Sequence, residues 1–152
     1  MIVTDWQHLV RAFNRMAGQT VNGIPQLPSR RDADLFLGKL VPGREGERGD
    51  GLLYEELEEM RVAQRERNLP AFVDGIADLV YVALGLANAV GVDLDPIFAA
   101  VHQANMAKLG GPKREDGKQM KPEGWAPPDI AAELRKQGWK LPAAAKFIKE
   151  AP

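Results

Sequence analysis

The segment that most restricts the fold of this chain is a long apolar stretch between Pro70 and Gly91. Proline is favourable in the first turn of a helix, and glycine commonly follows the last turn, so this stretch is predicted to be one helix. Its apolar residues recur on one face, while Asp74 and Asp78 share another face at i and i+4. Beyond Asp78 the helix is apolar nearly all round, which predicts burial on most sides and makes Asp78 a buried or clefted acid.

The remaining helical patterns are shorter, and no stretch shows a convincing β-strand alternation. Thr4 and Gln7 are predicted to form the capping box of a first helix that ends at Gly18. Further helices are predicted over residues 29–41, 52–68, 95–109, 130–137 and 143–150. The glycine-rich, charged connection 42–51 is expected to be exposed and mobile. The sequence therefore predicts an all-α fold in which the helices over 52–68 and 70–91 pack together.

The length and charge of the chain bound its organisation and its partners. A chain of 152 residues suits a single domain over 1–152, with a basic loop and short tail helices over 111–152. The absence of cysteine excludes thiol chemistry and suits a reducing cytosol. A net charge of −1 gives no overall attraction to nucleic acid or to an anionic membrane. Residues 1–10 lack a signal-peptide core, and the region 79–92 is too short and interrupted to span a bilayer, so we expect a cytoplasmic protein without a membrane partner.

Carboxylates on the helix that starts at Leu52 are the first candidate site residues. Glu56 falls inside the apolar arc of this helix, Glu59 lies beside that arc, and Glu55 is at its edge. A solvated glutamate-rich face is the ordinary interpretation of such a run. An inward carboxylate, however, costs roughly several kcal/mol unless it is paired or bound to a metal, so Glu56 needs a partner.

The neighbouring helix supplies further acids rather than a cation. Asp74 and Asp78 would repel the glutamates of the first helix unless something neutralises them all. Oxygen ligands that converge from two helices are what Mg²⁺ or Mn²⁺ binds, so a divalent-cation site is predicted here. The alternative is that Arg61, Arg65 or another base pairs with these acids in a purely structural role.

A basic segment follows on the next helix and loop. His102, Asn105 and Lys108 project from one helical face, and His102 is equally suited to packing or capping. The loop that follows adds four cations, namely Lys113, Arg114, Lys118 and Lys121. Lysine and arginine at such a loop suit phosphate groups, although a solvated charged loop would have the same composition. Metal-ligating acids together with phosphate-binding cations point to cleavage of a phosphoanhydride.

Three segments resemble the MazG-like all-α nucleoside triphosphate (NTP) pyrophosphatases, in the branch similar to phosphoribosyl-ATP pyrophosphohydrolase. They are residues 53–59 (LYEELEE), residues 74–82 (DGIADLVYV), and residues 101–109 together with 116–122. The resemblance spans roughly residues 5–130 and implies a MazG-like helical bundle with short C-terminal helices. It also implies a homo-oligomer, a dimer or a tetramer, with the active site often close to the subunit interface. One position departs from the family pattern Glu-x-x-Asp, because Gly75 stands three residues before Asp78; Asp74 is the candidate substitute.

The resemblance implies hydrolysis of an NTP between its α and β phosphates to the monophosphate and pyrophosphate. It implies two or three Mg²⁺ ions, for which Mn²⁺ can substitute. The implied metal ligands are Glu56, Glu59 and Asp78 with Asp74 or Glu55, and the attacking water is oriented or deprotonated by Glu55 or Glu56. The implied phosphate and sugar contacts are Asn105, Lys108, Lys113, Arg114, Lys118 and Lys121. Trp6 and Phe13 are candidates for the base pocket and equally for the core.

Three functions stay open at this point. The first is control of a nucleotide pool in the cytosol of a bacterium or a phage-infected host, with a deoxynucleotide such as dGTP, dUTP or dCTP as substrate. The second is the same chemistry on phosphoribosyl-ATP. The third is a non-catalytic helical nucleotide-binding protein in which Gly75 marks a decayed metal site.

Overall fold

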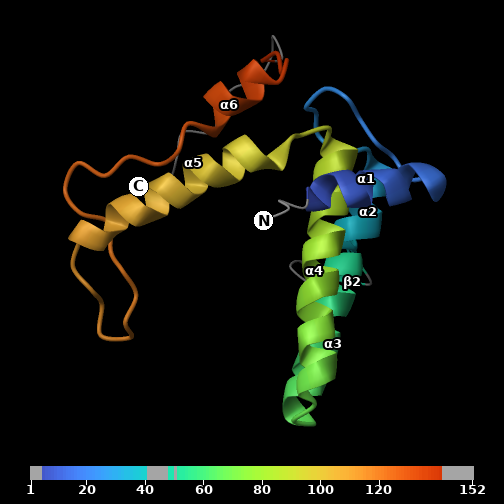
Figure 1. The fold of residues 1–152 in the computed structure, drawn as a ribbon, viewed down its shortest axis with the longest axis horizontal. Helices are drawn as coiled ribbons and strands as arrows, with labels where there is room; N and C mark the ends of the chain where they lie inside the picture. The colour runs from blue at the N-terminus through green and yellow to red at the C-terminus, as the bar shows by residue number, and fades with distance from the viewer. Residues whose placement is uncertain (1–4, 41–47, 50, 142–152) are drawn as a thin grey trace.

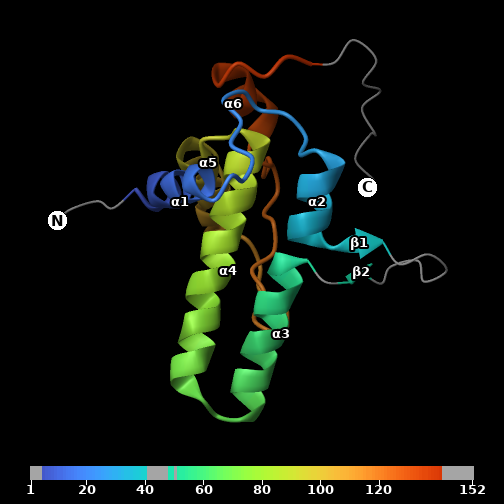
Figure 2. The ribbon, with the colours of Figure 1, turned by 90° about the vertical axis from the view of Figure 1, so that its right-hand side faces the viewer.

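A computed structural model describes residues 5–40, 48–49 and 51–141 of the chain (Figures 1 and 2). Its helices are α1 (Trp6–Met16), α2 (Arg30–Leu37), α3 (Leu52–Arg65), α4 (Leu69–Val90), α5 (Leu94–Met106) and α6 (Ile130–Lys136), with a 3₁₀ helix η1 (Ala107–Gly110). The predicted all-α fold is confirmed. The sequence did not predict β1 (Lys39–Leu40) and β2 (Arg48–Gly49), which pair antiparallel with Lys39 opposite Gly49.

Helices α3 and α4 form an antiparallel hairpin, as predicted (Figure 2). The side chain of Asn68 caps α4 by accepting a hydrogen bond from the backbone N–H of Ala71 at 3.2 Å. Pro70 occupies the first turn, and Gly91 ends the helix in the left-handed conformation with φ of 79°. The long apolar helix therefore begins and ends at the residues that its local sequence indicates.

Helix α1 packs across the C-terminal part of α4 through buried polar side chains. Asn88, which is 1% exposed, accepts a hydrogen bond from Gln7 Nε2 at 3.1 Å and donates to Asn14 Oδ1 at 3.1 Å. The predicted capping role of Gln7 is wrong, because its side chain is used in this tertiary contact. Asp5 caps α1 instead by accepting from the N–H of His8 at 2.8 Å, and Thr4 lies outside the described residues.

Beyond Gly91 the chain turns away from the hairpin and forms an arm, which we define as residues 94–125. The arm contains α5, η1 and the loop that follows, and Figure 1 shows it running away from α3 and α4. Asp93 caps α5, accepting from the N–H of Asp95 at 3.1 Å, so the prediction that Asp95 caps this helix is wrong by two residues. Helix α5 packs chiefly on η1 and α6.

The expected burial of α4 on most sides is wrong for the single chain. Val73 is 53% exposed and Ile76 is 43% exposed, because α3 and α1 each cover only part of the helix surface. Residues 69–90 are long and apolar enough to cross a membrane by length and composition, which the sequence reading of 79–92 underestimated. One such helix is weak evidence for a membrane span, since the core helix of a soluble protein can be equally long and apolar.

Other boundaries differ in smaller ways. Helix α2 ends at Leu37 rather than residue 41, because Gly38 has φ of 78°, and Ser29, where the helix was predicted to start, is its N-cap. The predicted helix over 130–137 is confirmed as α6. The predicted helix over 143–150, and most of the connection 42–51, lie outside the described residues.

Candidate functional site

The α3–α4 hairpin gathers the predicted acids, which we call the acidic group: Glu55, Glu56, Glu59, Asp74 and Asp78. Burial raises the pKa of Glu56, and the negative charges of Asp78, Glu59, Glu55 and Asp74 raise it further in that order. The carboxylates are therefore close enough for their charges to act on one another. A cation at this position would relieve that repulsion.

The exposure of these acids differs from the sequence expectation. Glu56 is half-buried, whereas Asp78 is exposed, so the prediction of a buried or clefted Asp78 is wrong for the single chain. Asp74 lies on the same flank of α4 and is exposed as well. Among the described residues no group of three or more histidine, aspartate or glutamate side chains is drawn together closely enough to hold a metal ion. The donor chemistry fits Mg²⁺, and side-chain rotation would be needed to close these carboxylates on an ion.

A base that neutralises the acidic group is not found in the described part of the chain. Arg61, one of the alternative partners, forms an ion pair with Glu58 on the other side of α3. None of the ion pairs between described residues includes a member of the acidic group. Arg61 therefore does not support the alternative in which a base pairs with the acidic group in a purely structural role.

The departure at Gly75 has a packing basis. A Cβ atom at Gly75 would lie 2.5 Å from Cγ of Met60 and 3.7 Å from the carbonyl oxygen of Glu56. Position 75 therefore faces α3, and Met60 fills the space beside it. Asp74, one position earlier, is exposed, so it can reach solvent without entering this contact.

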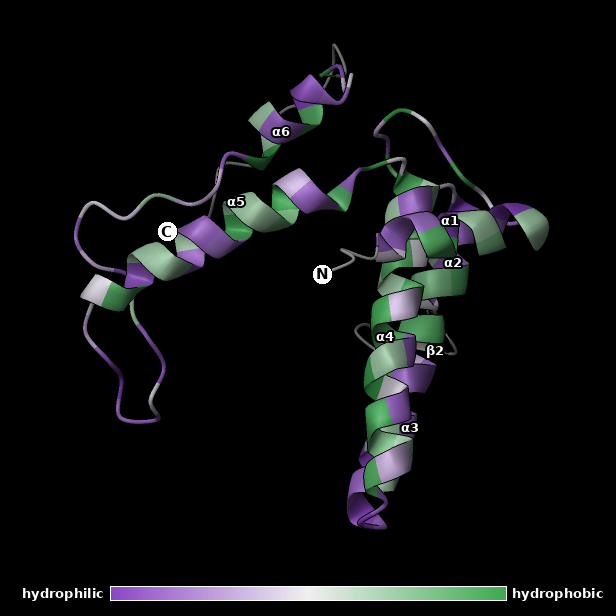
Figure 3. Ribbon diagram, viewed as in Figure 1, coloured by the Kyte–Doolittle hydropathy of each residue, from purple (hydrophilic) through white to green (hydrophobic). Residues whose placement is uncertain are grey.

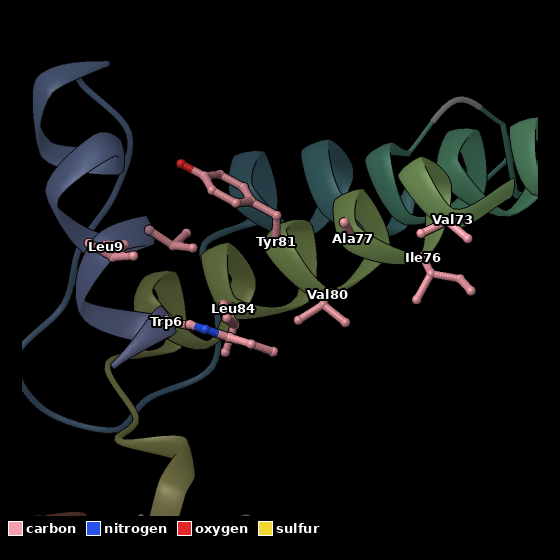
Figure 4. Close-up of a pocket in the computed structure, with 9 residues that line it drawn as sticks. Trp6, Leu9, Val73, Ile76, Ala77, Val80, Tyr81 and Leu84 are labelled. Atoms are coloured by element: carbon pink, nitrogen blue, oxygen red, sulfur yellow. The ribbon is translucent and has the colours of Figure 1, made fainter. Parts of the chain in front are cut away.

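Aromatic residues lie on α4 beside the acids. The ring of Phe13 packs edge to face against Tyr81 with centroids 5.8 Å apart. Tyr81 follows Asp78 by three residues and is therefore its neighbour on the helix surface. Sequence reasoning missed Tyr81, although its i+3 spacing from Asp78 was the available signal. Trp6 lies in a groove between α1 and α4, so both predicted base-pocket residues are placed beside α4 (Figure 4).

On the arm, two of the predicted phosphate-binding residues, Lys108 and Lys121, lie over the ring of Trp125, a residue that sequence reasoning missed. The ammonium groups of Lys108 and Lys121 lie 5.2 Å and 4.4 Å from the centroid of the Trp125 ring. The indole N–H of Trp125 donates to the carbonyl of Ala104 at 2.8 Å, and Lys108 donates to Oδ1 of Asn105 at 2.7 Å. Cation–π attraction therefore brings two positive charges to one aromatic ring. We call Lys108, Lys121 and Trp125 the basic group.

The other predicted cations belong to a small hairpin between Pro112 and Met120. Arg114 is paired with Asp116, and this hydrogen bond raises the pKa of Arg114 and lowers the pKa of Asp116. Lys113 faces Gln119 in an isolated antiparallel bridge, and the N–H of Lys118 donates to Asp116 at 3.1 Å. The charge of Arg114 is thus already engaged.

The structure does not bring all predicted site residues together in one chain. The basic group belongs to the arm and the acidic group to the α3–α4 hairpin, and Figure 1 shows the arm and the hairpin as different parts of the molecule. Figure 3 shows the same division by hydropathy, with a largely hydrophobic α4 and a hydrophilic loop after η1.

The described residues form an all-α protein in which the helix pair α3 and α4 gathers carboxylates. Residues 41–105 match the family model described as phosphoribosyl-ATP pyrophosphohydrolase, a family of the MazG-like NTP pyrophosphatase branch. The match contains all of α3 and α4, and it ends before the loop that carries Lys113 and Lys121. A comparison with curated proteins found no match to the chain. The family match supports pyrophosphohydrolase activity on a nucleotide.

Proposed function

We propose that this protein is a Mg²⁺-dependent pyrophosphohydrolase that cleaves a nucleoside triphosphate between its α and β phosphates. The observation that carries the proposal is the acidic group of the hairpin, in which burial and then the neighbouring negative charges raise the pKa of Glu56, and none of the described ion pairs includes a member of the group. The family match over 41–105 supports the same reaction class. The products are the nucleoside monophosphate and pyrophosphate.

Glu56, Glu59 and Asp78 would hold the metal, with Asp74 or Glu55 contributing. Bound Mg²⁺ would offset the phosphate charge and favour ionisation of water. Water forms the new bond to the α phosphorus, and the bridging oxygen leaves with the β phosphate. A carboxylate of α3, Glu55 or Glu56, orients this water and accepts its proton.

The basic group binds the phosphates of the substrate. Lys108 and Lys121 point at the same ring of Trp125, so a phosphate placed there meets two ammonium groups. Their charges offset the negative charge that the leaving pyrophosphate gains. Asn105 contacts the sugar or a phosphate, and Lys113 and Lys118 add positive potential from the neighbouring hairpin.

The base of the nucleotide stacks on the aromatic side of α4. The Phe13 and Tyr81 pair lies one helical turn from Asp78, which places an aromatic surface beside the acids. Trp6 extends this surface into the groove. We favour a deoxynucleotide such as dGTP, dUTP or dCTP as substrate. Phosphoribosyl-ATP is the second candidate, because the matched family carries that description.

The protein acts as a homo-oligomer, a dimer or a tetramer. The exposed apolar residues of α4, among them Val73 and Ile76, support an assembly, because contiguous apolar surface of this kind marks an interaction site. Size-exclusion chromatography with light scattering measures the assembly directly.

The reaction is tested with a panel of canonical nucleoside triphosphates, deoxynucleoside triphosphates and phosphoribosyl-ATP. Each is incubated with Mg²⁺, with Mn²⁺ and with EDTA, and the products are separated by chromatography. Metal-dependent formation of a monophosphate and pyrophosphate without a diphosphate is expected for one preferred substrate. No turnover of any member would contradict the proposal and would favour a nucleotide-binding protein with a decayed metal site.

A further inference from the structure

A polar cavity lies where the hairpin meets the arm. It has a volume of about 270 Å³, and its lining includes Arg11 and Arg15 of α1, Asn22 of the loop after α1, and Asp93 and Gln137. Figure 2 shows α1, α5 and α6 around the C-terminal end of α4. The cavity is therefore built from segments that are distant in the sequence.

This cavity is separate from both the acidic group and the basic group. Asp78 lies 13 positions before Gly91, which lines the cavity. That separation corresponds to about 20 Å along an α-helix. In the other direction, Figure 1 shows the loop after η1 at the far end of α5 from this junction. A small ligand in the cavity therefore contacts neither group of the same chain.

Two arginines face the cavity without a carboxylate partner among the described residues. Arg11 and Arg15 are at i and i+4 on α1, so their positive charges are neighbours on the helix surface. None of the ion pairs between described residues includes either of them. Nε of Arg11 donates to Oδ1 of the buried Asn88 at 3.3 Å, which orients the guanidinium and leaves its terminal nitrogens for another acceptor. Guanidinium groups placed in this way suit a phosphate, whose oxygens accept paired hydrogen bonds.

The cavity also contains a carboxylate, which a simple anion would avoid. Asp93 accepts a hydrogen bond from the N–H of Asp95 at 3.1 Å, and its carboxylate has the capacity to accept more. Gln137 fixes Asp93 by accepting from its N–H at 2.8 Å and donating to its carbonyl at 2.9 Å. No ion pair between described residues joins Asp93 to the arginines of the same cavity. A ligand that satisfies both charges carries a phosphate for the arginines and a hydroxyl group that donates to the carboxylate.

The size and lining of the cavity limit the rest of the ligand. Pockets for drug-sized ligands have volumes of about 300–1,000 Å³, so a cavity of about 270 Å³ suits a smaller molecule. Among the described residues that line it there is no aromatic ring on which a nucleotide base would stack. A pentose phosphate has the required phosphate and hydroxyl groups and no ring that needs stacking.

We propose that this cavity binds a sugar phosphate, with its phosphate on Arg11 and Arg15 and a sugar hydroxyl donating to Asp93. The ligand is a free pentose phosphate or the ribose phosphate end of a nucleotide whose base stays outside. It contacts α1 and the residue directly before α5, so it ties the root of the arm to the hairpin. This second site goes beyond the proposed hydrolysis and does not depend on it.

Calorimetric titration with ribose 5-phosphate in EDTA tests the site. The titration uses the Lys108→Ala, Lys121→Ala protein, so that the basic group takes no part. Adding Arg15→Gln is expected to weaken binding by about 10-fold or more, because charge-assisted hydrogen bonds to the phosphate are lost. Arg31→Gln makes the same charge change on the exposed surface of α2 and should leave binding unchanged. Absence of ribose 5-phosphate binding, or equal affinities in two folded arginine variants, would overturn the proposal.

Replacing Asp93 distinguishes a sugar phosphate from a simple anion. Asparagine is also a favourable helix N-cap, so Asp93→Asn retains the start of α5. Ribose 5-phosphate should bind about 5-fold more weakly, because its hydroxyl loses a charged acceptor. Sulfate has no hydrogen to donate at neutral pH, so it should bind more tightly once the negative charge is removed. Asp95→Asn, in the exposed first turn of α5, is the matched control. A change in the same direction for both ligands would overturn the assignment of a sugar phosphate.

Adenosine monophosphate identifies the source of the ligand. Binding as tight as that of ribose 5-phosphate, and weakened by Arg15→Gln, would assign the site to the ribose phosphate end of a nucleotide. Exclusion of adenosine monophosphate would assign it to a free sugar phosphate, and either result supports the site. Because these titrations contain EDTA and measure no turnover, failure of the proposed hydrolysis leaves their outcome unchanged.

Discussion

In the α3–α4 hairpin the acids project from two helices packed on one another, whereas in the arm the lysines are held by a single aromatic ring. The hairpin holds its acids near one another, and burial together with the negative charges of the neighbouring acids raises the pKa of Glu56. The arm offsets the repulsion of its lysines locally, because both ammonium groups contact Trp125. The comparison teaches that the two regions manage their charges differently, and the proposed function accordingly assigns the chemistry to the hairpin and the binding of substrate charge to the arm.

The largest effect is expected for Asp78→Asn. The exchange keeps the size of the side chain and removes a metal-ligating charge, so turnover should fall by about 10³-fold or more with the helical content retained. Steady-state kinetics and circular dichroism measure the two quantities. Glu58→Gln is the matched control, because Glu58 lies in the same hairpin and pairs with Arg61. Wild-type turnover in the Asp78→Asn variant would refute the assignment of chemistry to the hairpin.

The arm should respond through substrate affinity. Lys108→Ala with Lys121→Ala is expected to raise KM by about 10- to 100-fold, with a smaller change in kcat, because charge-assisted contacts to phosphate are lost. Lys136→Ala, which removes a lysine paired with Glu133 on α6, serves as the control. A fall in kcat without a change in KM would contradict the division of roles.

The close packing of Met60 against Gly75 should limit which side chains the hairpin can accommodate at position 75. Gly75→Glu is expected to lower the free energy of unfolding by about 1–3 kcal/mol, because the new side chain must displace Met60. Adding Met60→Ala should recover part of that loss and strengthen Mn²⁺ binding, measured by calorimetry. Met60→Ala alone is the control. Equal Mn²⁺ affinity in the single and double variants would show that position 75 does not reach the ion.

The smallest effect concerns pH. Because the folded state raises the pKa of Glu56, this residue favours folding only when protonated, and its contribution is lost as pH rises through the raised pKa. Glu56→Gln should therefore raise the melting temperature in EDTA at neutral pH by about 1–3 °C, with the gain vanishing below the ordinary pKa of glutamate. Thermal scans across pH measure this difference. A gain in melting temperature that grows as the pH falls would have the opposite sign. It would contradict the conclusion that ionised Glu56 destabilises the folded state.

Much of the hairpin follows from its sequence. Asn68, Pro70 and Gly91 act through local backbone geometry, so the limits of α4 could be predicted from the residues themselves. The shared stripe of Asp74 and Asp78 likewise follows from helical periodicity. The exposure of Asp78 could not be predicted in this way, because it depends on which faces of α4 other elements cover.

The arrangement of the arm and α1 is harder to predict from the sequence, because the contacts that determine it join distant parts of the chain. Gln7 matched a local capping pattern, yet its side chain binds Asn88, Val92 and Leu94. The direction of α5 depends on these contacts, so no local pattern shows that the basic group lies apart from the acids. Trp125 stands in an aperiodic loop, where spacing gave no sign that two lysines would meet its ring.

The contact of Lys108 and Lys121 with Trp125 also makes the arm observable. The fluorescence of an indole depends on the positions of nearby charges. Phosphate that draws the two lysines away from the ring should therefore change the fluorescence of the protein. With Trp6 and Trp139 replaced by phenylalanine, the emission comes from Trp125 alone. The binding of pyrophosphate to the arm can then be followed optically, without an attached dye and separately from catalysis.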